Sequence, residues 1–469
     1  MKSLQSSTIS AVNQPGTSLK RRVFNASAWS LAGYGASMAI RLGSNLIMTR
    51  LLVPEMFGVM AIANIIMIGL AMFSDLGLGQ NIVQSRRGSE PEFLNTAWSL
   101  QIIRGMLLWL VSVCIAVAIF FADHIGMIPA TSVYSNPILP YVISILSFGT
   151  VIGGFGTTKV YEANRNLALA RVTKINLLAQ VIGLVCMLAW AYFDRSIWAL
   201  VSGAIAASAA TVLLGHSLLP GTANRWHWDS SAVSDISHFG KWIFASSILG
   251  FLVTNTDRLM LGSMVDGTML GIYSIAYLMA SAVDQTVGRI VGAVTLPALS
   301  EIARGGGDLR AAYYRFHAVV SAASYFSAGA LLTSGSTLVG LLYDHRYADA
   351  GWMLQILSLT LLTTPFGIAS QSYLAIGKPK LLFRILVVRF LVMVPSIYLG
   401  FHFWALPGAL CGVVISQISV LPLILFLNAK FKLLDLRKEL LALLMLFPGA
   451  IAGWIMTLVV GHYAMAVHS

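Results

Sequence analysis

Charged side chains inside long apolar stretches are the residues of this sequence best suited to chemistry. These residues are Arg41, Asp75, Arg104, Asp284, Arg289 and Arg389. A charged side chain at the centre of a bilayer costs about 2.5–3.5 kcal/mol on insertion scales, so each is expected to face a cavity or a partner. At a helical rise of about 1.5 Å per residue, four of the six fall near the middle of their stretches, whereas Arg41 and Asp75 lie toward an end.

Two of these stretches carry their polar residues at helical spacing. One stripe consists of Ser37, Arg41 and Asn45, each four residues after the last. The second stripe consists of Tyr273, Tyr277, Ser281, Asp284 and Gly288. Residues three or four apart share one face of a helix, so each stripe forms a polar face on an otherwise apolar helix. We predict that the two faces line a central, water-filled cleft.

The chemistry expected of this cleft is the binding of an anionic group that carries sugars. The arginine fork donates two parallel hydrogen bonds to a phosphate. Tyrosine offers a sugar an apolar ring with a polar tip, although a tyrosine stripe more often serves packing than sugar binding. The candidate cavity residues are Arg41, Asn45, Arg104, Tyr273, Tyr277, Arg289 and Arg389. Asp75 and Asp284 are the candidate carboxylates for coupling to a proton or Na⁺ gradient, and no other cofactor is expected.

Local pairing is the competing interpretation for several of these charges. Asp284 and Arg289 could neutralise each other, although five residues is a poor spacing for a pair within one helix. Asp257 and Arg258 lie close to the end of their stretch, where a local ion pair or a side chain that reaches toward water is favoured over substrate contact. Asp75 is equally suited to capping or pairing near the inner interface.

The elements that would position these residues are transmembrane helices. Of the 469 residues, 57% are hydrophobic and only 10% are charged, which is too few charges for a soluble protein of this length. Apolar runs of about 20 residues, the length that crosses about 30 Å of hydrocarbon, recur along the chain. We predict an all-α polytopic membrane protein with about 13 transmembrane helices, within a range of 12–14. The spans are expected near 23–48, 57–80, 94–120, 139–158, 173–193, 197–219, 241–262, 269–298, 314–341, 352–376, 381–400, 405–427 and 439–461.

The distribution of basic residues predicts the orientation of the chain. With the N-terminus in the cytoplasm, most of the 30 Lys and Arg residues fall in cytoplasmic segments, and only Arg50, Arg195 and Arg346 fall in the opposite loops. Cytoplasmic loops of membrane proteins carry such an excess of basic residues. The net charge of +12 is explained in this way, and we expect no nucleic-acid partner.

An internal repeat divides the chain into two parts. The pattern of residues 57–63, Phe-Gly-Val-Met-Ala-Ile-Ala, returns at residues 270–276 as Leu-Gly-Ile-Tyr-Ser-Ile-Ala. Six spans in each part give both parts the same orientation, with a pseudo-two-fold axis along the membrane normal. We expect a cytoplasmic tail at 1–22, an N-lobe at 23–219, a linker at 220–240, a C-lobe at 241–427, and a basic loop with one extra span at 428–469.

No constellation for catalysis or metal binding is visible in the sequence. The histidines are scattered without metal-ligand spacing. The three cysteines all fall inside apolar segments. Gly305-Gly-Gly307 is not followed by the Lys and Ser/Thr of a phosphate-binding loop. We therefore expect neither an enzyme nor a metal site.

Four motifs resemble those of a known family of membrane proteins. They are Arg50-Leu-Leu-Val-Pro-Glu-Met-Phe-Gly-Val-Met-Ala61, Asp75-Leu-Gly-Leu-Gly79, Asn255-Thr-Asp-Arg258 and Leu296-Pro-Ala-Leu-Ser300. Through them the chain resembles bacterial oligosaccharide flippases, the polysaccharide-transport branch of the multidrug/oligosaccharidyl-lipid/polysaccharide (MOP) superfamily. The resemblance implies a twelve-helix, two-lobed core with a V-shaped central cavity. Many members of this branch have fourteen spans, so the stretch 439–461 is either one span or a hairpin.

The resemblance also implies transport of a lipid-linked substrate. Members of this branch move undecaprenyl-diphosphate-linked oligosaccharide units across the bacterial inner (cytoplasmic) membrane for O-antigen, capsule or exopolysaccharide assembly, and alternating access is the expected mechanism. The expected partners are that substrate, membrane lipids, and the polymerase and glycosyltransferases of the pathway. Two alternatives stay open. One is a multidrug/cation antiporter of the same superfamily, whose cavity would hold more carboxylates than arginines, and the other is a non-transporting membrane assembly partner.

Overall fold

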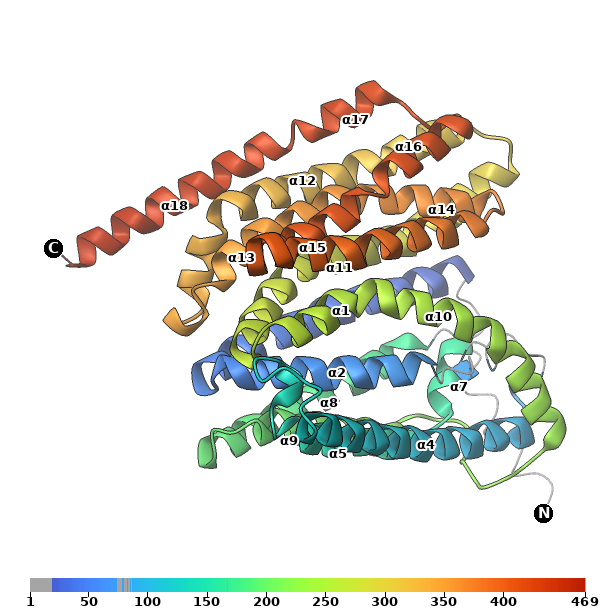
Figure 1. Ribbon diagram of the computed structural model, residues 1–469. Coiled ribbons are helices and arrows are strands. Elements are labelled where there is room, and N and C mark those ends of the chain that lie inside the picture. The colour runs from blue at the N-terminus through green and yellow to red at the C-terminus, as the bar shows by residue number, and fades with distance from the viewer. Residues whose placement is uncertain are drawn as a thin grey trace, which may run out of the picture.

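The computed structural model describes residues 19–73, 78–79, 82, 85, 87–166 and 168–468, and the regular elements within these ranges are helices (Figure 1). The first half of the chain forms α1 (Leu19–Leu51), α2 (Pro54–Phe73), α4 (Pro91–His124), η1 (Val133–Ser135), α5 (Leu139–Leu146), α6 (Phe148–Gly154), α7 (Lys159–Arg165), α8 (Leu169–Phe193) and α9 (Trp198–Leu218). The second half forms α10 (Ser230–Met264), α11 (Gly267–Arg304), α12 (Leu309–Leu342), η2 (His345–Tyr347), α13 (Ala350–Ser358), η3 (Leu359–Phe366), α14 (Gly367–Ala375), α15 (Lys380–Ile418), α16 (Leu421–Lys430), α17 (Leu436–Leu443) and α18 (Leu446–His468).

The all-α, multi-pass membrane architecture is confirmed. Nine helical segments of the described chain are long and apolar enough to cross a membrane, and the bent pair Leu139–Gly154 and Lys159–Arg165 brings the number to ten. One of the nine, Lys380–Lys430, covers 51 residues and contains two of the expected spans. The total of thirteen spans stays a prediction.

α15 turns back on itself, because the chain leaves helical geometry at Trp404 and Ala405, where Ala405 has a φ of 49°. A Cβ atom at Gly400 would lie 2.2 Å from the carbonyl oxygen of Gly408. In a straight helix these two residues would be about 12 Å apart, so the segments before and after the break form a hairpin. Glycine permits this approach because it has no side chain.

Aspartates cap the starts of three long helices and one short helix of the second half. Their carboxylates accept a hydrogen bond from a backbone N–H in the first turn, which caps the unpaired donors at the start of each helix. The capping pairs are Asp229 with Ser231 before α10, Asp266 with Met269 before α11, Asp308 with Ala311 before α12, and Asp435 with Lys438 before α17.

The linker between the two halves is bound to the first half. We call residues 222–229 the strap, because backbone N–H groups along it donate to side chains of the first half. The pairs are Thr222 with Glu162, Arg225 with Asn95, His227 with Ser99, and Asp229 with Thr96, at 2.9–3.1 Å. Arg87 closes the strap with an ion pair of 2.8 Å to Asp229, and its hydrogen bond lowers the pKa of Asp229 to about 2.

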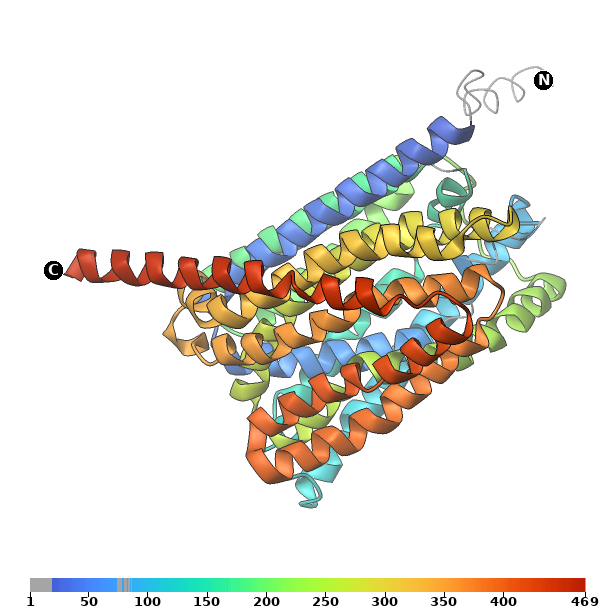
Figure 2. The same cartoon turned by 90° about the horizontal axis from the view of Figure 1, so that it is seen from above.

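The C-terminal helices pack against α12 and form one candidate span, Leu436–His462, where the sequence also allowed a hairpin (Figure 2). α18 ends at the opposite end of the molecule from the start of α1, as an odd number of crossings requires. Small residues bring α18 close to α12: a Cβ atom at Gly453 would lie 2.3 Å from the carbonyl oxygen of Ala330. Thr333 also donates to the carbonyl oxygen of Ala450 at 3.0 Å. Such contacts hold transmembrane helices together.

Enlarging Gly453 is therefore expected to separate α18 from α12. Gly453→Leu should lower the melting temperature of the detergent-solubilised protein by several degrees, because the leucine displaces backbone contacts in a close-packed interface. Gly461→Leu is the matched control on the same helix, since a Cβ atom there would meet nothing within 4 Å. Equal melting temperatures for the two variants, measured by intrinsic fluorescence, would contradict this packing.

Candidate functional site

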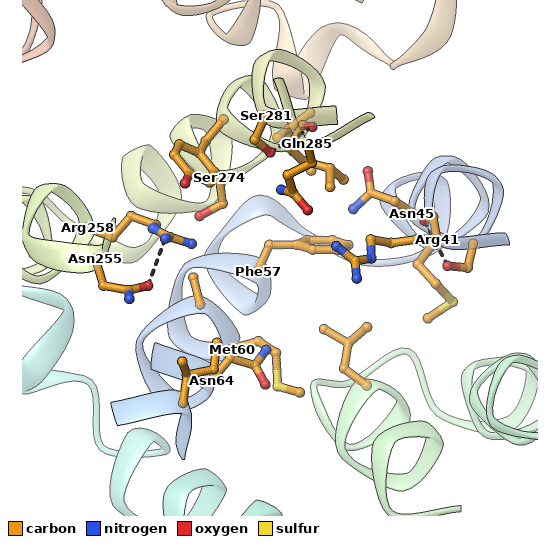
Figure 3. Close-up of a pocket in the computed structure, with 18 of the residues that line it drawn as sticks. Arg41, Asn45, Phe57, Met60, Asn64, Asn255, Arg258, Ser274, Ser281 and Gln285 are labelled. Carbon is orange, nitrogen blue, oxygen red and sulfur yellow. Dashed lines mark hydrogen bonds between the residues drawn. The ribbon is translucent and has the colours of Figure 1, made fainter. Parts of the chain in front are cut away.

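A cavity of about 800 Å³ lies between the two halves of the chain (Figure 3). Its walls are α1 and α2 from the first half and α10 and α11 from the second, with Met187 of α8 and Leu200 of α9 completing the first-half side. The polar lining residues are Arg41, Ser44, Asn45, Asn64, Thr254, Asn255, Arg258, Ser274, Tyr277, Ser281, Asp284 and Gln285. The cavity therefore combines a polar lining with the methionines and Phe57 that separate its polar groups.

One end of the cavity is closed by direct backbone contact between α2 and α11. A Cβ atom at Gly58 would lie 2.0 Å from the carbonyl oxygen of Gly267, and one at Gly271 would lie 1.9 Å from that of Pro54. Only glycine lets two backbones approach so closely. We call this the sealed end, and the fully buried Ile62 lies beside the contact.

Three side chains from the second half also hold the last turns of α1 at the sealed end. Tyr343 donates to Asn45 Oδ1 at 2.9 Å, Arg346 Nη2 to the carbonyl oxygen of Thr49 at 3.0 Å, and Tyr347 to that of Leu52 at 3.2 Å. Asn45 and Thr49 lie one turn apart on one face of α1, and Leu52 follows directly after the end of the helix. We call these three bonds the latch.

Asp344 fixes the orientation of the central latch residue. Its carboxylate pairs with the guanidinium of Arg346, and this hydrogen bond lowers the pKa of Asp344. The carboxylate therefore stays charged at neutral pH and keeps Arg346 directed toward the end of α1. A cation at the C-terminal end of a helix is favoured by the helix dipole.

The opposite end of the cavity, which we call the open end, faces the side of the molecule where α7, α14 and α16 lie (Figure 1). On that side α1 and α11 meet through looser contacts, in which Tyr34 donates to Gln285 at 3.5 Å and the Arg289 guanidinium stacks 4.9 Å from the Tyr34 ring. Arg41 and Asp284 line the cavity and are exposed. A central cavity between the two halves is thus present, and its predicted V shape stays a prediction.

The two cavity arginines differ in how they are held. Arg258 lies 4.2 Å above the Tyr277 ring, donates to Asn255 at 2.8 Å, and has its Nε 3.8 Å from Asp257. Arg41 makes no hydrogen bond, ion pair or ring contact through its guanidinium within the part of the chain that the structure describes. In Figure 3, Arg41 and Asn45 lie on one side of the cavity and Arg258 and Asn255 on the other.

Asp284 is the single carboxylate among the lining residues. It accepts a hydrogen bond of 2.6 Å from Thr364, which belongs to η3. A 3₁₀ segment in the middle of a span often marks a functional hinge. Asp284 thus joins the cavity wall to a broken helix of the second half.

Four of the predicted cavity residues do not line this cavity. Arg104 donates to the carbonyl oxygen of Ala71 at 2.6 Å and so joins α4 to α2. Tyr273 is fully buried and donates to Asp257 at 2.6 Å.

The remaining two lie on α11 and α15. Arg289 stacks on Tyr34 beyond the cavity, toward the open end. Arg389 has a buried Nε without a hydrogen-bond partner in the described chain, and its charge interacts with Asp257, Tyr277 and Asp284. The other carboxylate proposed for coupling, Asp75, lies outside the described residues.

The structure adds lining residues that the sequence interpretation did not select. Asn64 and Phe57 come from α2, Asn255 and Arg258 from α10, and Gln285 from α11. Asn64 could have been found, because it is an isolated amide in an apolar helix. Arg258 belongs to the motif Asn255-Thr-Asp-Arg258, but its position close to the end of a predicted span suggested contact with water instead. Within the described residues, no group of three or more His, Cys, Asp or Glu is placed to hold a metal ion.

Comparison with known proteins identifies a family and a shared fold for this chain. A family model described as polysaccharide biosynthesis protein matches residues 47–352. The lipopolysaccharide biosynthesis protein WzxC of Escherichia coli (strain K12) is 24% identical over 403 residues, which cover 86% of this chain and 80% of WzxC.

Two solved structures share the fold. The lipid II flippase MurJ in an inward closed conformation superposes with a TM-score of 0.65 at 13% identity, covering 94% of this chain and 99% of MurJ. An inward-facing multidrug resistance MATE family transporter of the MOP superfamily superposes with a TM-score of 0.58 at 15% identity, covering 91% and 97%. At these identities the likeness concerns the fold alone.

Proposed function

The chain belongs to the polysaccharide biosynthesis protein family, and from that premise we propose that it translocates lipid-linked oligosaccharide units across the bacterial inner membrane. The substrate headgroup would be an undecaprenyl diphosphate that carries the sugars. WzxC, which resembles this chain along most of its length, is a lipopolysaccharide biosynthesis protein, and that likeness supports the same role here. The polymerase and glycosyltransferases of the pathway are the partners we propose.

The unpartnered Arg41 inside the central cavity is the observation that carries this proposal. An uncompensated cation in a membrane is expensive and is expected to meet an anion. Arg258, on the opposite wall, is fixed by Tyr277 and Asn255 and so presents the rest of its guanidinium in one orientation. Two arginines that face one cavity suit the two phosphates of a diphosphate, because each fork donates parallel hydrogen bonds.

Alternating access is the mechanism we propose. The headgroup would enter at the open end, past Arg289, while the prenyl chain stays in lipid. The lobes at 23–219 and 241–427 would then rock, which breaks the contact of α2 with α11 at the sealed end and opens the cavity to the other side. In the orientation that the basic residues favour, the N-terminus is cytoplasmic and the sealed end is periplasmic.

Asp284 is the carboxylate that we propose for coupling to a proton or Na⁺ gradient. It lines the cavity and is bonded to Thr364, so a change of its charge would reach both the substrate space and η3. Asp75 is retained as a second coupling candidate on the strength of the sequence alone.

The lining charges oppose the antiporter alternative. A cavity for cationic drugs would be dominated by carboxylates, whereas here Arg41 and Arg258 face one carboxylate, Asp284. An anionic substrate is therefore favoured, since complementary charge selects a ligand and repels its opposite.

Reconstitution into liposomes tests the proposal. A lipid-linked oligosaccharide with a fluorescent sugar is placed in the bilayer, and dithionite added outside bleaches the molecules of the outer leaflet. The purified protein should allow nearly all of the fluorescence to be bleached, whereas protein-free liposomes should retain the inner-leaflet half. The proposal would be overturned if the inner-leaflet fluorescence were retained with the protein present under an imposed proton or Na⁺ gradient. Export of ethidium by the same liposomes would then favour the antiporter.

A further inference from the structure

Asn45 belongs to the cavity wall and to the latch at the same time. Its side chain lines the cavity, and its Oδ1 accepts the hydrogen bond from Tyr343. The other two latch bonds end on backbone carbonyl oxygens of Thr49 and Leu52. Within the described chain, Asn45 is thus the latch acceptor whose side chain is free to turn.

Asn45 lies between Arg41 on one side and the Tyr343 hydroxyl on the other, because of the direction in which α1 runs. α1 runs toward the sealed end, so Arg41 lies one turn farther from that end than Asn45, and Tyr343 lies on the sealed side. A group bound by Arg41 would therefore be next to the Asn45 amide, because residues four apart are neighbours on a helix face. The Asn45 side chain can form a hydrogen bond with the bound group or with Tyr343, depending on its rotation.

We propose that a diphosphate bound at Arg41 draws the Asn45 amide away from Tyr343 and thereby releases the latch. This inference rests on the proposed function. It means that Asn45 and Tyr343 couple the binding of substrate in the cavity to the opening of the sealed end. Nδ2 of Asn45 would donate to a phosphate oxygen, and this bond is stronger than the neutral one that Oδ1 accepts from Tyr343, so the side chain turns toward the anion.

The loss of this bond weakens the sealed arrangement for a specific reason. Tyr343 is 4% exposed, so little water can reach its hydroxyl to replace Asn45. A buried hydroxyl without a partner is costly and favours a state in which it becomes solvated. Ligand binding then shifts the population toward the open state, because the ligand binds the sealed state less well.

A cysteine placed just inside the seal reports the opening. The reporter chain carries Ser274→Cys, with the native Cys114, Cys186 and Cys411 changed to serine. Ser274 lines the cavity one turn beyond Gly271, which contacts Pro54. A membrane-impermeant maleimide is added outside right-side-out vesicles that have been fused with liposomes containing undecaprenyl diphosphate or phospholipid only.

Two tyrosine variants separate coupling from simple loosening. In the reporter chain, undecaprenyl diphosphate should raise the labelling rate about fivefold, the equivalent of one neutral hydrogen bond. Tyr343→Phe should label at this raised rate without ligand and gain nothing more when ligand is added. Tyr347→Phe removes a latch bond to a backbone oxygen, so it should also label faster at rest but should keep the ligand-dependent increase. An equal ligand-dependent increase in both variants would overturn the proposal.

A ligand-free comparison keeps the test independent of the substrate. Asn45→Ala should label at least as fast as Tyr343→Phe, because it leaves the Tyr343 hydroxyl without a partner, and the double variant should label no faster than Asn45→Ala. If undecaprenyl diphosphate fails to speed labelling of the reporter chain, the proposed substrate is wrong. If Asn45→Ala labels at the resting rate of the reporter chain, the latch role of Asn45 is wrong whatever the substrate.

Discussion

Cells in which Arg41→Gln and Arg258→Gln are combined are expected to export no surface polysaccharide. Each arginine would donate charge-assisted hydrogen bonds to the diphosphate, and such bonds contribute about 1.5–3 kcal/mol each. Since 1.4 kcal/mol is tenfold in affinity, each single variant should transport roughly 10–100-fold more slowly. Glutamine keeps much of the side-chain length and polarity, so the loss reports the charge. The measurement is the rate of dithionite bleaching in liposomes, together with polysaccharide at the cell surface.

Two further arginines distinguish a cavity effect from a general one. Arg195 is exposed in the loop between α8 and α9, and Arg195→Gln should leave transport unchanged. Arg104→Gln removes a bond between α4 and α2, so it should lower the melting temperature while sparing the affinity for undecaprenyl diphosphate. A loss of affinity in Arg104→Gln, with Arg41→Gln unaffected, would show that the substrate path runs elsewhere.

A single methyl group at the sealed end is expected to stop transport. Gly58→Ala places a Cβ atom 2.0 Å from the backbone oxygen of Gly267, and no flexible side chain is present to give way. The α2–α11 contact must separate, so the sealed state becomes unfavourable and the protein rests open on the side that is now closed. Labelling of the Ser274→Cys reporter by the impermeant maleimide should rise to its maximum, and bleaching of lipid-linked oligosaccharide should fall at least tenfold. Close-packed backbones store such a clash as several kcal/mol.

Gly340→Ala is the control for the methyl group itself. Gly340 lies on α12, where a Cβ atom would meet nothing within 4 Å. Alanine there should be neutral or slightly stabilising, because glycine inside a helix costs about 0.5–1 kcal/mol relative to alanine. Slow labelling of the Gly58→Ala reporter would mean that the seal does not depend on the glycine contact.

The helical architecture was accessible from the sequence because membrane spans are local. Apolar runs of sufficient length can only be helices in hydrocarbon, where every backbone group must be bonded within its own segment. The break at Trp404 and Ala405 falls between the predicted spans 381–400 and 405–427. The 3₁₀ segment η3 contains Pro365, which lacks the backbone N–H of an α-helical bond, but the extent of the segment over eight residues does not follow from that proline.

The spacing of polar residues on α1 predicted only part of the cavity lining. Arg41 and Asn45 line the cavity, whereas Ser37 donates to Gln180 of α8 at 2.9 Å. Eight residues at about 100° each leave Ser37 and Asn45 roughly 80° apart around the helix. Residues four apart are therefore neighbours on a helix, but residues eight apart no longer share one face.

Burial along α11 could not be predicted from periodicity either. Tyr273 and Asp284 share nearly the same face, because eleven residues bring a helix back to within about 20°. Tyr273 is nevertheless fully buried, since it lies close to the glycine contact of the sealed end, while Asp284 faces the open part of the cavity. The burial of the two residues is decided by how close each lies to the contact between α2 and α11, which are distant in sequence.

The bound strap has a mechanical consequence for the whole molecule. With residues 222–229 bound to the first half, no slack loop is left to absorb movement between the halves. The next element, α10, has 35 residues and is about 52 Å long, and it contacts α2 and α4 on one side and α15 on the other. A change in the angle between the halves must therefore bend or tilt this helix. Bending α10 costs elastic energy that grows with the change in angle between the halves. The bent helix would therefore favour the return of the two halves to their original angle.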